Sequence, residues 1–397
     1  MWWHNHICFS RKNYSKLSKK FIVKQLDGLH NVSPKDWNNL IDYSNPFLRH
    51  EYLYGLEKHY CLNNHGWLPC HLVVYRDKRL VGALPLYARS NSYGEFVFDW
   101  AWANAYEQNG KDYYPKLVTA IPYAPVCGPR YLVNSNTLFS ERIKELLLEK
   151  VLDIVKQNNF SSYHCLFTNN NDHKTLSNSS LIPRSTCQFR WHNNNYQDFN
   201  DFLSHLTSKK RKQIKRERKY INDNDIKIEV LSGESITKEK WILFYEFYCS
   251  TFYRKWGNPR LTLDFFIYLG RCMPSETILI FAKSNDIYIA GAFLMRDQST
   301  LYGRHWGCSS KLPYLHFELC YYYPIEYCIN NKIRKLDAGV QGEHKIWRGF
   351  EPYSATSYHW IEHLGFRKAI KDYLDRETTE IDSYIENLKT HLPFKDL

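Results

Sequence analysis

The sequence lacks the features that mark several common protein classes. It has no run of 18 apolar residues, the length that a membrane-spanning helix needs. Its eleven cysteines are scattered and form no Cys-x-x-Cys pair, which disfavours a disulfide framework or a zinc site. There is no Walker loop, dinucleotide-binding glycine fingerprint, His-Glu-x-x-His or Gly-x-Ser-x-Gly. We therefore expect a cytoplasmic globular protein without a transmembrane segment or a metal site, outside these enzyme classes.

The composition is that of a folded chain with one strongly basic segment. The 397 residues are 44% hydrophobic and 16% aromatic, enough for two or three domains with packed cores. Residues 209–219 carry +7 of the net charge of +12, so the charge is a local feature. Residues 1–20 are also basic and lack the apolar core of a secretory signal. We expect a disordered extension there, with an organelle transit peptide as the alternative.

Short matches at constant spacing indicate an internal duplication. Three of them lie 209 residues apart: Gly82-Ala83 and Gly291-Ala292, Tyr93-Gly94 and Tyr302-Gly303, Tyr113-Tyr114-Pro115 and Tyr322-Tyr323-Pro324. A fourth, Asn45-Pro46-Phe47-Leu48 and Asn258-Pro259-Arg260-Leu261, has an offset of 213. Repeats of this kind predict two copies of one fold. We expect a first unit at 21–195, a basic helical connector at 196–225 and a second unit at 226–397.

Apolar periodicity predicts the same kind of architecture in each unit. The first unit is expected to contain helices at 37–41, 50–59 and 114–121 and strands at 71–75, 80–87 and 95–100. The second is expected to contain helices at 241–253, 263–271 and 316–330 and strands at 277–283, 287–295, 300–306 and 335–340. The predicted fold class is α+β, with a mixed sheet and flanking helices in each unit.

The densest polar cluster is the glycine-punctuated segment 337–350 of the second unit. It holds several ionisable side chains, whereas the corresponding segment 125–130 of the first unit lacks the Glu, the His and the Lys. Residues present in one copy only indicate a site, whereas residues shared by both copies indicate the fold. Glu343 or His344 could act as the general base that an amine nucleophile needs at neutral pH. The alternative is a salt-bridged loop held by Arg348.

Two further groups of the second unit are candidates for substrate contacts. His316 and Glu318 open the long helix, whose N-terminal N–H groups could bind an anion. The alternative is ordinary helix-dipole stabilisation by Glu318. Arg304 and His305 lie next to each other on a strand and point to opposite faces, so one of the two can face a cleft.

In the first unit, Asp99 and Trp100 could line a substrate cleft, although a core position is the commoner role for such residues. The basic connector helix offers a surface for RNA or another polyanion, the alternative being a solvated linker. Its candidate polyanion-binding residues are Lys209, Lys210, Arg211, Lys212, Lys215 and Arg216.

Several segments occur in the order seen in a known family. They are Asn45-Pro46-Phe47-Leu48, His50-Glu51, Tyr93 to Trp100, Tyr302-Gly303-Arg304, Leu315-His316-Phe317-Glu318 and Gln341-Gly342-Glu343-His344-Lys345. In these the chain resembles the bacterial predicted N-acyltransferases that are labelled peptidoglycan biosynthesis or recognition proteins. The resemblance implies the GNAT superfamily, in the double-GNAT arrangement of Fem-type aminoacyl transferases. It also implies transfer of an acyl or aminoacyl group to a small-molecule amine, from acyl-CoA or from aminoacyl-tRNA.

Our hypothesis is therefore an N-acyltransferase with its chemistry in the second unit. Glu343 or His344 would remove the proton of the amine, while Arg304 and Lys345 would neutralise a charged substrate. Gln341, His316, Glu318, Arg348, Asp99 and Trp100 complete the predicted substrate-binding set. The alternatives are a non-catalytic protein on the same fold that recognises a polyanion or a cell-wall precursor, and an RNA-binding protein.

Overall fold

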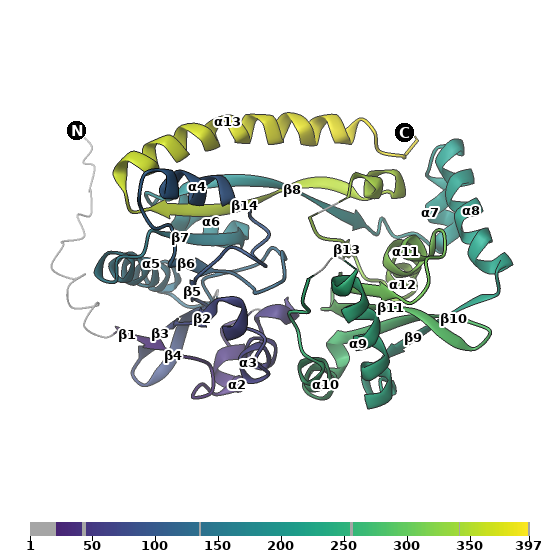
Figure 1. Ribbon diagram of the computed structural model, residues 1–397, viewed down its shortest axis with the longest axis horizontal. Coiled ribbons are helices and arrows are strands. Elements are labelled where there is room, and N and C mark those ends of the chain that lie inside the picture. Colours follow the sequence, from purple (N-terminus) through teal and green to yellow (C-terminus); the bar gives the residue numbers. More distant parts are fainter. Residues whose placement is uncertain (1–20, 42–44, 135, 255–256, 341, 396–397) are drawn as a thin grey trace, which may run out of the picture.

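The computed structural model describes residues 21–41, 45–134, 136–254, 257–340 and 342–395. The predicted N-terminal extension, residues 1–20, and the candidate residue Gln341 lie outside the described residues. The strands form two sheets (Figure 1). The three-stranded sheet has the order β1 (Phe21–Leu26), β3 (His71–Arg76) and β4 (Arg79–Leu84). The eleven-stranded sheet has the order β2 (Trp67–Pro69), β5 (Tyr87–Arg89), β6 (Lys116–Thr119), β7 (Ser162–Thr168), β14 (Glu351–Ile361), β8 (Ile182–His192), β13 (Lys335–Asp337), β12 (Thr300–Cys308), β11 (Ile287–Arg296), β10 (Thr277–Ser284) and β9 (Ile226–Ser232).

Helices cover both sheets. They are α2 (Pro34–Asn38), α3 (His50–Lys58), α4 (Trp100–Gln108), α5 (Ser140–Gln157), α6 (Asn170–Ser177), α7 (Phe199–Ser204), α8 (Ser208–Asp223), α9 (Lys238–Tyr253), α10 (Leu263–Cys272), α11 (Leu315–Phe317), α12 (Tyr323–Asn330) and α13 (Leu364–Lys389). A π-helical turn, η5 (Glu318–Tyr322), joins α11 to α12, and a 3-10 helix, η6 (Glu343–Arg348), follows β13. Among these described helices, none is both long and apolar enough to span a membrane. The predicted α+β class is confirmed.

The same order of elements occurs twice along the chain. Apart from the additional elements β2, β5 and α4, the first unit contains β1-α2-α3-β3-β4-β6-α5-β7, and apart from α11 the second contains β9-α9-α10-β10-β11-β12-α12-β13. In each unit the last two of these strands, β6 with β7 and β12 with β13, pair in parallel. Parallel neighbours need a crossover connection, which α5 and α12 supply. The predicted duplication is therefore present in the fold.

Two local predictions are corrected by the structure. Residues 95–100 form no strand, because the carboxylates of Glu95 and Asp99 turn inward to bind Lys116 and α4 begins at Trp100. Residues 114–121 form no helix but contain β6, whose four residues are all buried. A short run that is buried on both faces shows no alternation, so periodicity cannot distinguish it from a helix.

Of the three repeats with equal spacing, one joins equivalent positions. Gly82 lies in β4 and Gly291 in β11, each the second strand of a hairpin. Tyr93 lies in a loop, whereas Tyr302 lies in β12. Tyr113 precedes β6, whereas Tyr322 lies in a helix. The other two matches therefore do not reflect structural equivalence.

The two units exchange their last strands at the centre of the large sheet. The central order is β7-β14-β8-β13, so β14 pairs with β7 of the first unit and β8 pairs with β13 of the second. Helix α13 then runs along the molecule above both units (Figure 1). The predicted domain boundaries at residues 195 and 226 stay a prediction. Strands from both sides of these boundaries pair with each other in the large sheet.

Aromatic side chains of the two units pack against each other and form an interface. The ring of Phe47 lies 5.3 Å from that of Tyr302, and the ring of Tyr52 lies 5.5 Å from that of Phe265. Gly55 in α3 faces Tyr268 of α10 so closely that a Cβ atom would come within 2.9 Å of the Tyr268 ring. This interface is packed like a protein core, so the two units hold a fixed geometry.

The predicted connector helix is α8. Its apolar residues Ile214 and Ile221 are buried, as is Leu206 in the preceding turn. The spacing of seven residues places Ile214 and Ile221 on one face of the helix. The remaining faces carry the basic side chains that the sequence predicts for this segment.

Candidate active site

The parallel strands β12 and β13 separate at their C-terminal ends and leave a cavity. Their pairing ends at Tyr302 and Asp337, and the cavity of about 130 Å³ begins just beyond. A register shift between β11 and β12 and the π-helical turn η5 both border it. Such irregularities are frequent at functional sites. The cavity is lined by Ala292, Phe293, Leu294, Gly303, Arg304, His305, Trp306, His316, Leu319, Cys320, Tyr321 and Ala338.

Two histidines and a tyrosine meet beside this cavity. The ring of His316 lies 4.7 Å from that of Trp306 and 6.2 Å from that of His344. His344 Nε2 lies 3.0 Å from the hydroxyl of Tyr321. Gly342 has φ of 106°, and a Cβ atom there would come within 2.5 Å of the His344 ring. Glycine at this position therefore makes room for the imidazole.

Both imidazoles are held neutral. Burial lowers the pKa of His316 to about 4, and the positive charges of Arg348 and Lys345 act in the same direction. Burial, followed by the same two charges, also lowers the pKa of His344. A neutral imidazole at pH 7 is free to accept a proton, which is what a general base requires.

Lys345 places a cation at the end of β13. Its side chain is buried, and Nζ donates to the carbonyl oxygens of Ala338 at 2.6 Å and Gly339 at 3.1 Å. Burial lowers the pKa of Lys345 to about 8. The ammonium thus lies beside the cavity without a salt bridge to any described carboxylate.

The second candidate base, Glu343, points in another direction. Its side chain is exposed, and Oε1 accepts a hydrogen bond of 2.5 Å from the hydroxyl of Tyr384 in α13. His344, by contrast, contacts Tyr321 in the wall of the cavity. The geometry therefore favours His344 over Glu343 as the base.

Arg348 and Glu318, both predicted to bind substrate, are engaged within the protein. Arg348 Nη2 lies 2.9 Å from Glu217 of α8, and Arg348 Nη1 donates to the carbonyl oxygen of His344 at 2.9 Å. Glu318 binds Arg218 of α8 at 2.9 Å. These contacts fix η6 and η5 against α8. Their role in substrate binding stays a prediction that this geometry does not favour.

Arg304 reaches the boundary between the units. Its guanidinium donates to the carbonyl oxygen of Tyr123 and lies 5.4 Å from the ring of Phe47, both in the first unit. Its neighbour His305 packs on Tyr248 in the aromatic core, with ring centroids 5.0 Å apart. Arg304 is therefore the member of this pair that faces the boundary between the units.

The structure does not bring Asp99 and Trp100 into this cluster. Asp99 is buried in the first unit, where it binds Lys116 and accepts a 2.6 Å hydrogen bond from Tyr113. Burial acts to raise the pKa of Asp99, but the Lys116 ammonium outweighs it and holds that pKa below its ordinary value. Trp100 is 37% exposed and contacts Tyr93. Their predicted role in substrate binding is not supported by proximity to the cavity.

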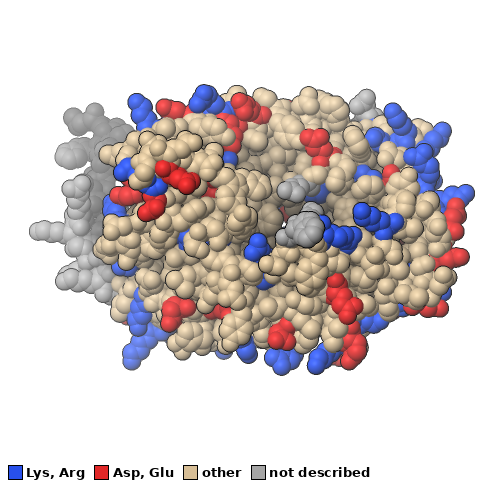
Figure 2. All heavy atoms as spheres, in the orientation of Figure 1, with Lys and Arg blue, Asp and Glu red and all other residues tan. Residues whose placement is uncertain are grey.

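The six basic candidates of α8 form a surface that adjoins η6. Within the described residues none of the six makes a salt bridge, in contrast to Arg218. Figure 2 shows Lys and Arg side chains gathered at the end of the molecule that α8 occupies in Figure 1. Lys210 Nζ lies 4.3 Å from the ring centre of Trp347, which is 45% exposed. We call the exposed side chains Lys209, Lys212, Lys215 and Arg216 the basic face.

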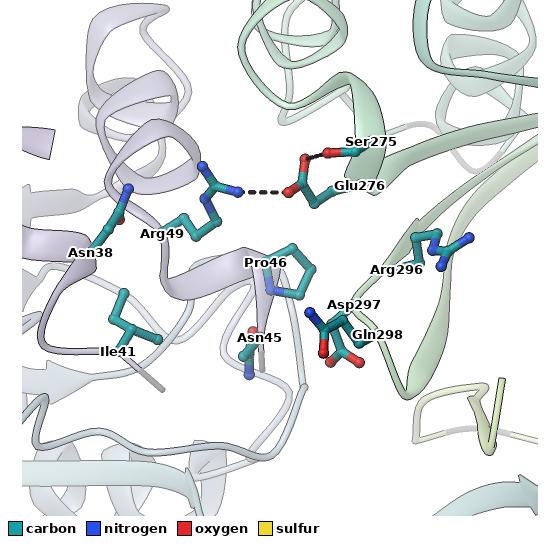
Figure 3. Close-up of a pocket in the computed structure, with 10 residues that line it drawn as sticks. All are labelled: Asn38, Ile41, Asn45, Pro46, Arg49, Ser275, Glu276, Arg296, Asp297 and Gln298. Carbon is teal, nitrogen blue, oxygen red and sulfur yellow. Dashed lines mark hydrogen bonds and ion pairs between the residues drawn. The ribbon is translucent and has the colours of Figure 1, made fainter. Parts of the chain in front are cut away.

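Another cavity, of about 400 Å³, lies between the two units (Figure 3). In its wall Arg49 of the first unit points toward Glu276 of the second, with a contact of 2.6 Å. These residues are 227 positions apart, so no local pattern could have paired them. The sequence also did not identify Tyr321 as a residue of the site between β12 and β13, because a tyrosine in an apolar helix is usually a core residue.

No curated protein matches the sequence. Among solved structures, FemX aligns with a TM-score of 0.53 at 11% identity, covering 88% of this chain and 100% of FemX. A tandem GNAT protein from the clavulanic acid biosynthesis pathway aligns with a TM-score of 0.45 at 10% identity, covering 86% of this chain and 98% of that one. A conserved protein of unknown function from Bacteroides thetaiotaomicron aligns with a TM-score of 0.49 at 11% identity, covering 85% and 99% of the two chains. The likeness to FemX concerns the fold.

A family model covers almost the whole chain. Residues 28–396 match FemAB_like, a family described by peptidoglycan biosynthesis/recognition. The match includes β2 to β14, but not β1, and it includes the segment that carries His344 and Lys345. The chain belongs to the FemAB_like family, in agreement with the resemblance seen in the sequence.

Proposed function

We propose that this protein is an N-acyltransferase that moves an acyl or aminoacyl group to an amine at the gap between β12 and β13. The observation that carries the proposal is the neutral His344, joined to Tyr321 in the cavity wall, with the Lys345 ammonium at the end of β13. A base and a cation on one side of a cavity are what aminolysis of an ester or thioester requires. Membership in the FemAB_like family supports the same reaction class.

The proposed reaction assigns one task to each group. The amine nitrogen attacks the donor carbonyl, and a C–N bond forms. Its proton passes through the Tyr321 hydroxyl to His344, and the Lys345 ammonium stabilises the developing oxyanion. The C–O bond of an aminoacyl ester, or the C–S bond of a thioester, then breaks. The proton on His344 returns to the leaving oxygen or sulfur.

The basic face favours aminoacyl-tRNA as the donor. A polyanion bound there would lie beside η6, because Lys210 packs on Trp347 and Glu217 binds Arg348. Cationic surfaces bind nucleic-acid phosphates with little sequence preference and strong dependence on salt. Acyl-CoA stays the alternative co-substrate, and the acceptor amine stays unassigned.

Donor binding and transfer test the proposal together. The purified protein would be titrated with aminoacyl-tRNA and with acetyl-CoA while thermal unfolding and loss of the donor acyl bond are followed. A donor at about 100 times its dissociation constant stabilises the fold by roughly 2.7 kcal/mol. We expect stabilisation by aminoacyl-tRNA and donor consumption in the presence of amines. Binding without consumption for any amine would favour the non-catalytic alternative.

Charge reversal on α8 separates the two donors. Lys212→Glu with Arg216→Glu should weaken aminoacyl-tRNA binding and flatten its salt dependence, because two phosphate contacts are lost. The matched control is Lys150→Glu with Lys156→Glu on α5, at the opposite end of the molecule (Figure 1). Equal loss in both variants would remove the basic face from donor binding. Unchanged acetyl-CoA binding is expected in both.

A further inference from the structure

A third cavity, distinct from the gap between β12 and β13, lies where the two units meet under the central strands. Its volume is about 490 Å³. The first unit contributes Gly128 and the asparagines Asn169, Asn170 and Asn171. The second contributes Asp297 and Lys335, while Arg190 on β8 lies between them. The proposed reaction uses none of these residues.

The two cations of this cavity, Arg190 and Lys335, differ in the partners that they have within the protein. Arg190 Nη2 binds Asp337 at 3.1 Å and the hydroxyl of Tyr353 at 3.0 Å, but its buried Nε has no hydrogen-bond partner among the described residues. Lys335 makes no salt bridge within the described part of the chain. The buried Nε is out of reach of a ligand atom, whereas the rest of the Arg190 side chain, which is 22% exposed, and Lys335 line the cavity and are available to one.

The one carboxylate in the lining, Asp297, has both oxygens engaged in hydrogen bonds within the protein. Asp297 Oδ1 accepts from Ser299 and Thr300, and Oδ2 accepts from the hydroxyl of Tyr302 at 2.9 Å. His173 also lines the cavity, and burial lowers its pKa, so it is neutral at pH 7. The remaining lining offers amide donors and two cations, which is the environment that binds an oxyanion.

We infer that this cavity binds the anionic head of a small polar ligand, a carboxylate or a phosphate, through Arg190 and Lys335. The asparagine amides would bind the polar part of the same ligand. Hydrogen bonds from charged donors are stronger than neutral ones, so the two cations would determine the affinity. This inference does not depend on the proposed transfer reaction, because ligand binding here needs no turnover.

Titration calorimetry at constant ionic strength tests the inference with two probes. Inorganic phosphate represents a phosphate head, and N-acetylglycine represents a carboxylate next to an amide. We expect saturable binding of at least one probe, and the tighter one identifies the class of ligand. Lys335→Gln should raise its dissociation constant about tenfold, the loss of one charge-assisted hydrogen bond. Absence of saturable binding by both probes would overturn the inference.

Two controls separate this cavity from other cationic surfaces. Lys156→Gln, an exposed position on α5, should leave binding unchanged. The Lys212→Glu, Arg216→Glu variant should also bind normally, because phosphate held on α8 would be a different site. Asn170→Ala supplies a variant without loss of charge, for which a weaker effect of the same sign is expected. Equal losses in Lys335→Gln and Lys156→Gln would contradict the assignment.

Discussion

One buried polar cluster of the first unit and one of the second differ in how their charges are paired. In the first unit, Lys116 contacts both Glu95 and Asp99, and Arg89 binds Glu95 at 3.0 Å, all within the interior. In the second, Lys345 binds carbonyl oxygens and His344 binds a hydroxyl. The first arrangement cancels its charges internally and holds a loop to β6. The second leaves a base and a cation unpaired beside a cavity, which is the condition for chemistry.

The comparison is tested most strongly by removing the lysine of each unit. Lys116→Met leaves the buried Asp99 without a cation and Glu95 with Arg89 alone, and breaking such a pair costs about 3–5 kcal/mol. Lys345→Met removes hydrogen bonds to two carbonyl groups, for which about 1–3 kcal/mol is expected. Urea unfolding of the two variants measures the difference. If Lys345→Met destabilised as much as Lys116→Met, the contrast between the units would be wrong.

The next largest effect is expected on turnover, when the proposed base His344 is replaced. His344→Asn should lower turnover by about a hundredfold or more, the usual contribution of a general base. Thermal unfolding should change little, because His344 is half-buried and makes one side-chain hydrogen bond. The same exchange at His205, exposed on the surface near α7, is the control. Normal turnover in His344→Asn would exclude this residue from the reaction.

Part of the fold and part of the candidate site could be predicted from the sequence. Periodicity predicted the hairpin of the second unit, its helices at 241–253 and 263–271 and the basic helix, but not α13, the longest helix of that unit. It failed at residues 95–100 and 114–121, where burial on both sides and ion pairs to distant residues decide the conformation. The segment with His344 and Lys345 stood out by composition. That Asp99 lies outside this cluster could not be predicted, because its position is set by the ion pair with Lys116, which no local sequence pattern indicates.

The pH dependence of the transfer rate tests the proposed roles of His344 as the base and Lys345 as the cation. The pKa of His344 is lowered from 6.5, so the rate should rise with pH, with a midpoint below 6.5, as the imidazole becomes neutral. Burial places the pKa of Lys345 at about 8, so the rate should fall above that pH as the ammonium is lost. The profile of kcat/KM is therefore expected to be bell-shaped.

Lys345→Arg tests the assignment of the alkaline limb. A guanidinium stays protonated throughout this range, so the fall above pH 8 should disappear even if the maximal rate is lower. The acid limb should not move. An alkaline limb that persists in Lys345→Arg would mean that another group controls it.

The smallest effect is expected at the contact between α13 and η6. Tyr384→Phe removes the hydrogen bond to Glu343, and Glu343→Gln removes its charge. Because this carboxylate is exposed and points away from the cavity wall, each change should alter turnover less than about threefold, the size of a solvent-exposed interaction. Steady-state kinetics of both variants provides the check. A loss in Glu343→Gln comparable to that in His344→Asn would make Glu343 the base.

Hydrogen exchange with and without aminoacyl-tRNA tests the central claim most directly, because it reports on both units in one experiment. The account predicts slower exchange in residues 303–320 and 342–350 of the second unit and in α8, with little change around Asp99 and Lys116. Protection concentrated around Asp99, Lys116 and His164 in the first unit, with none near His344, would contradict it.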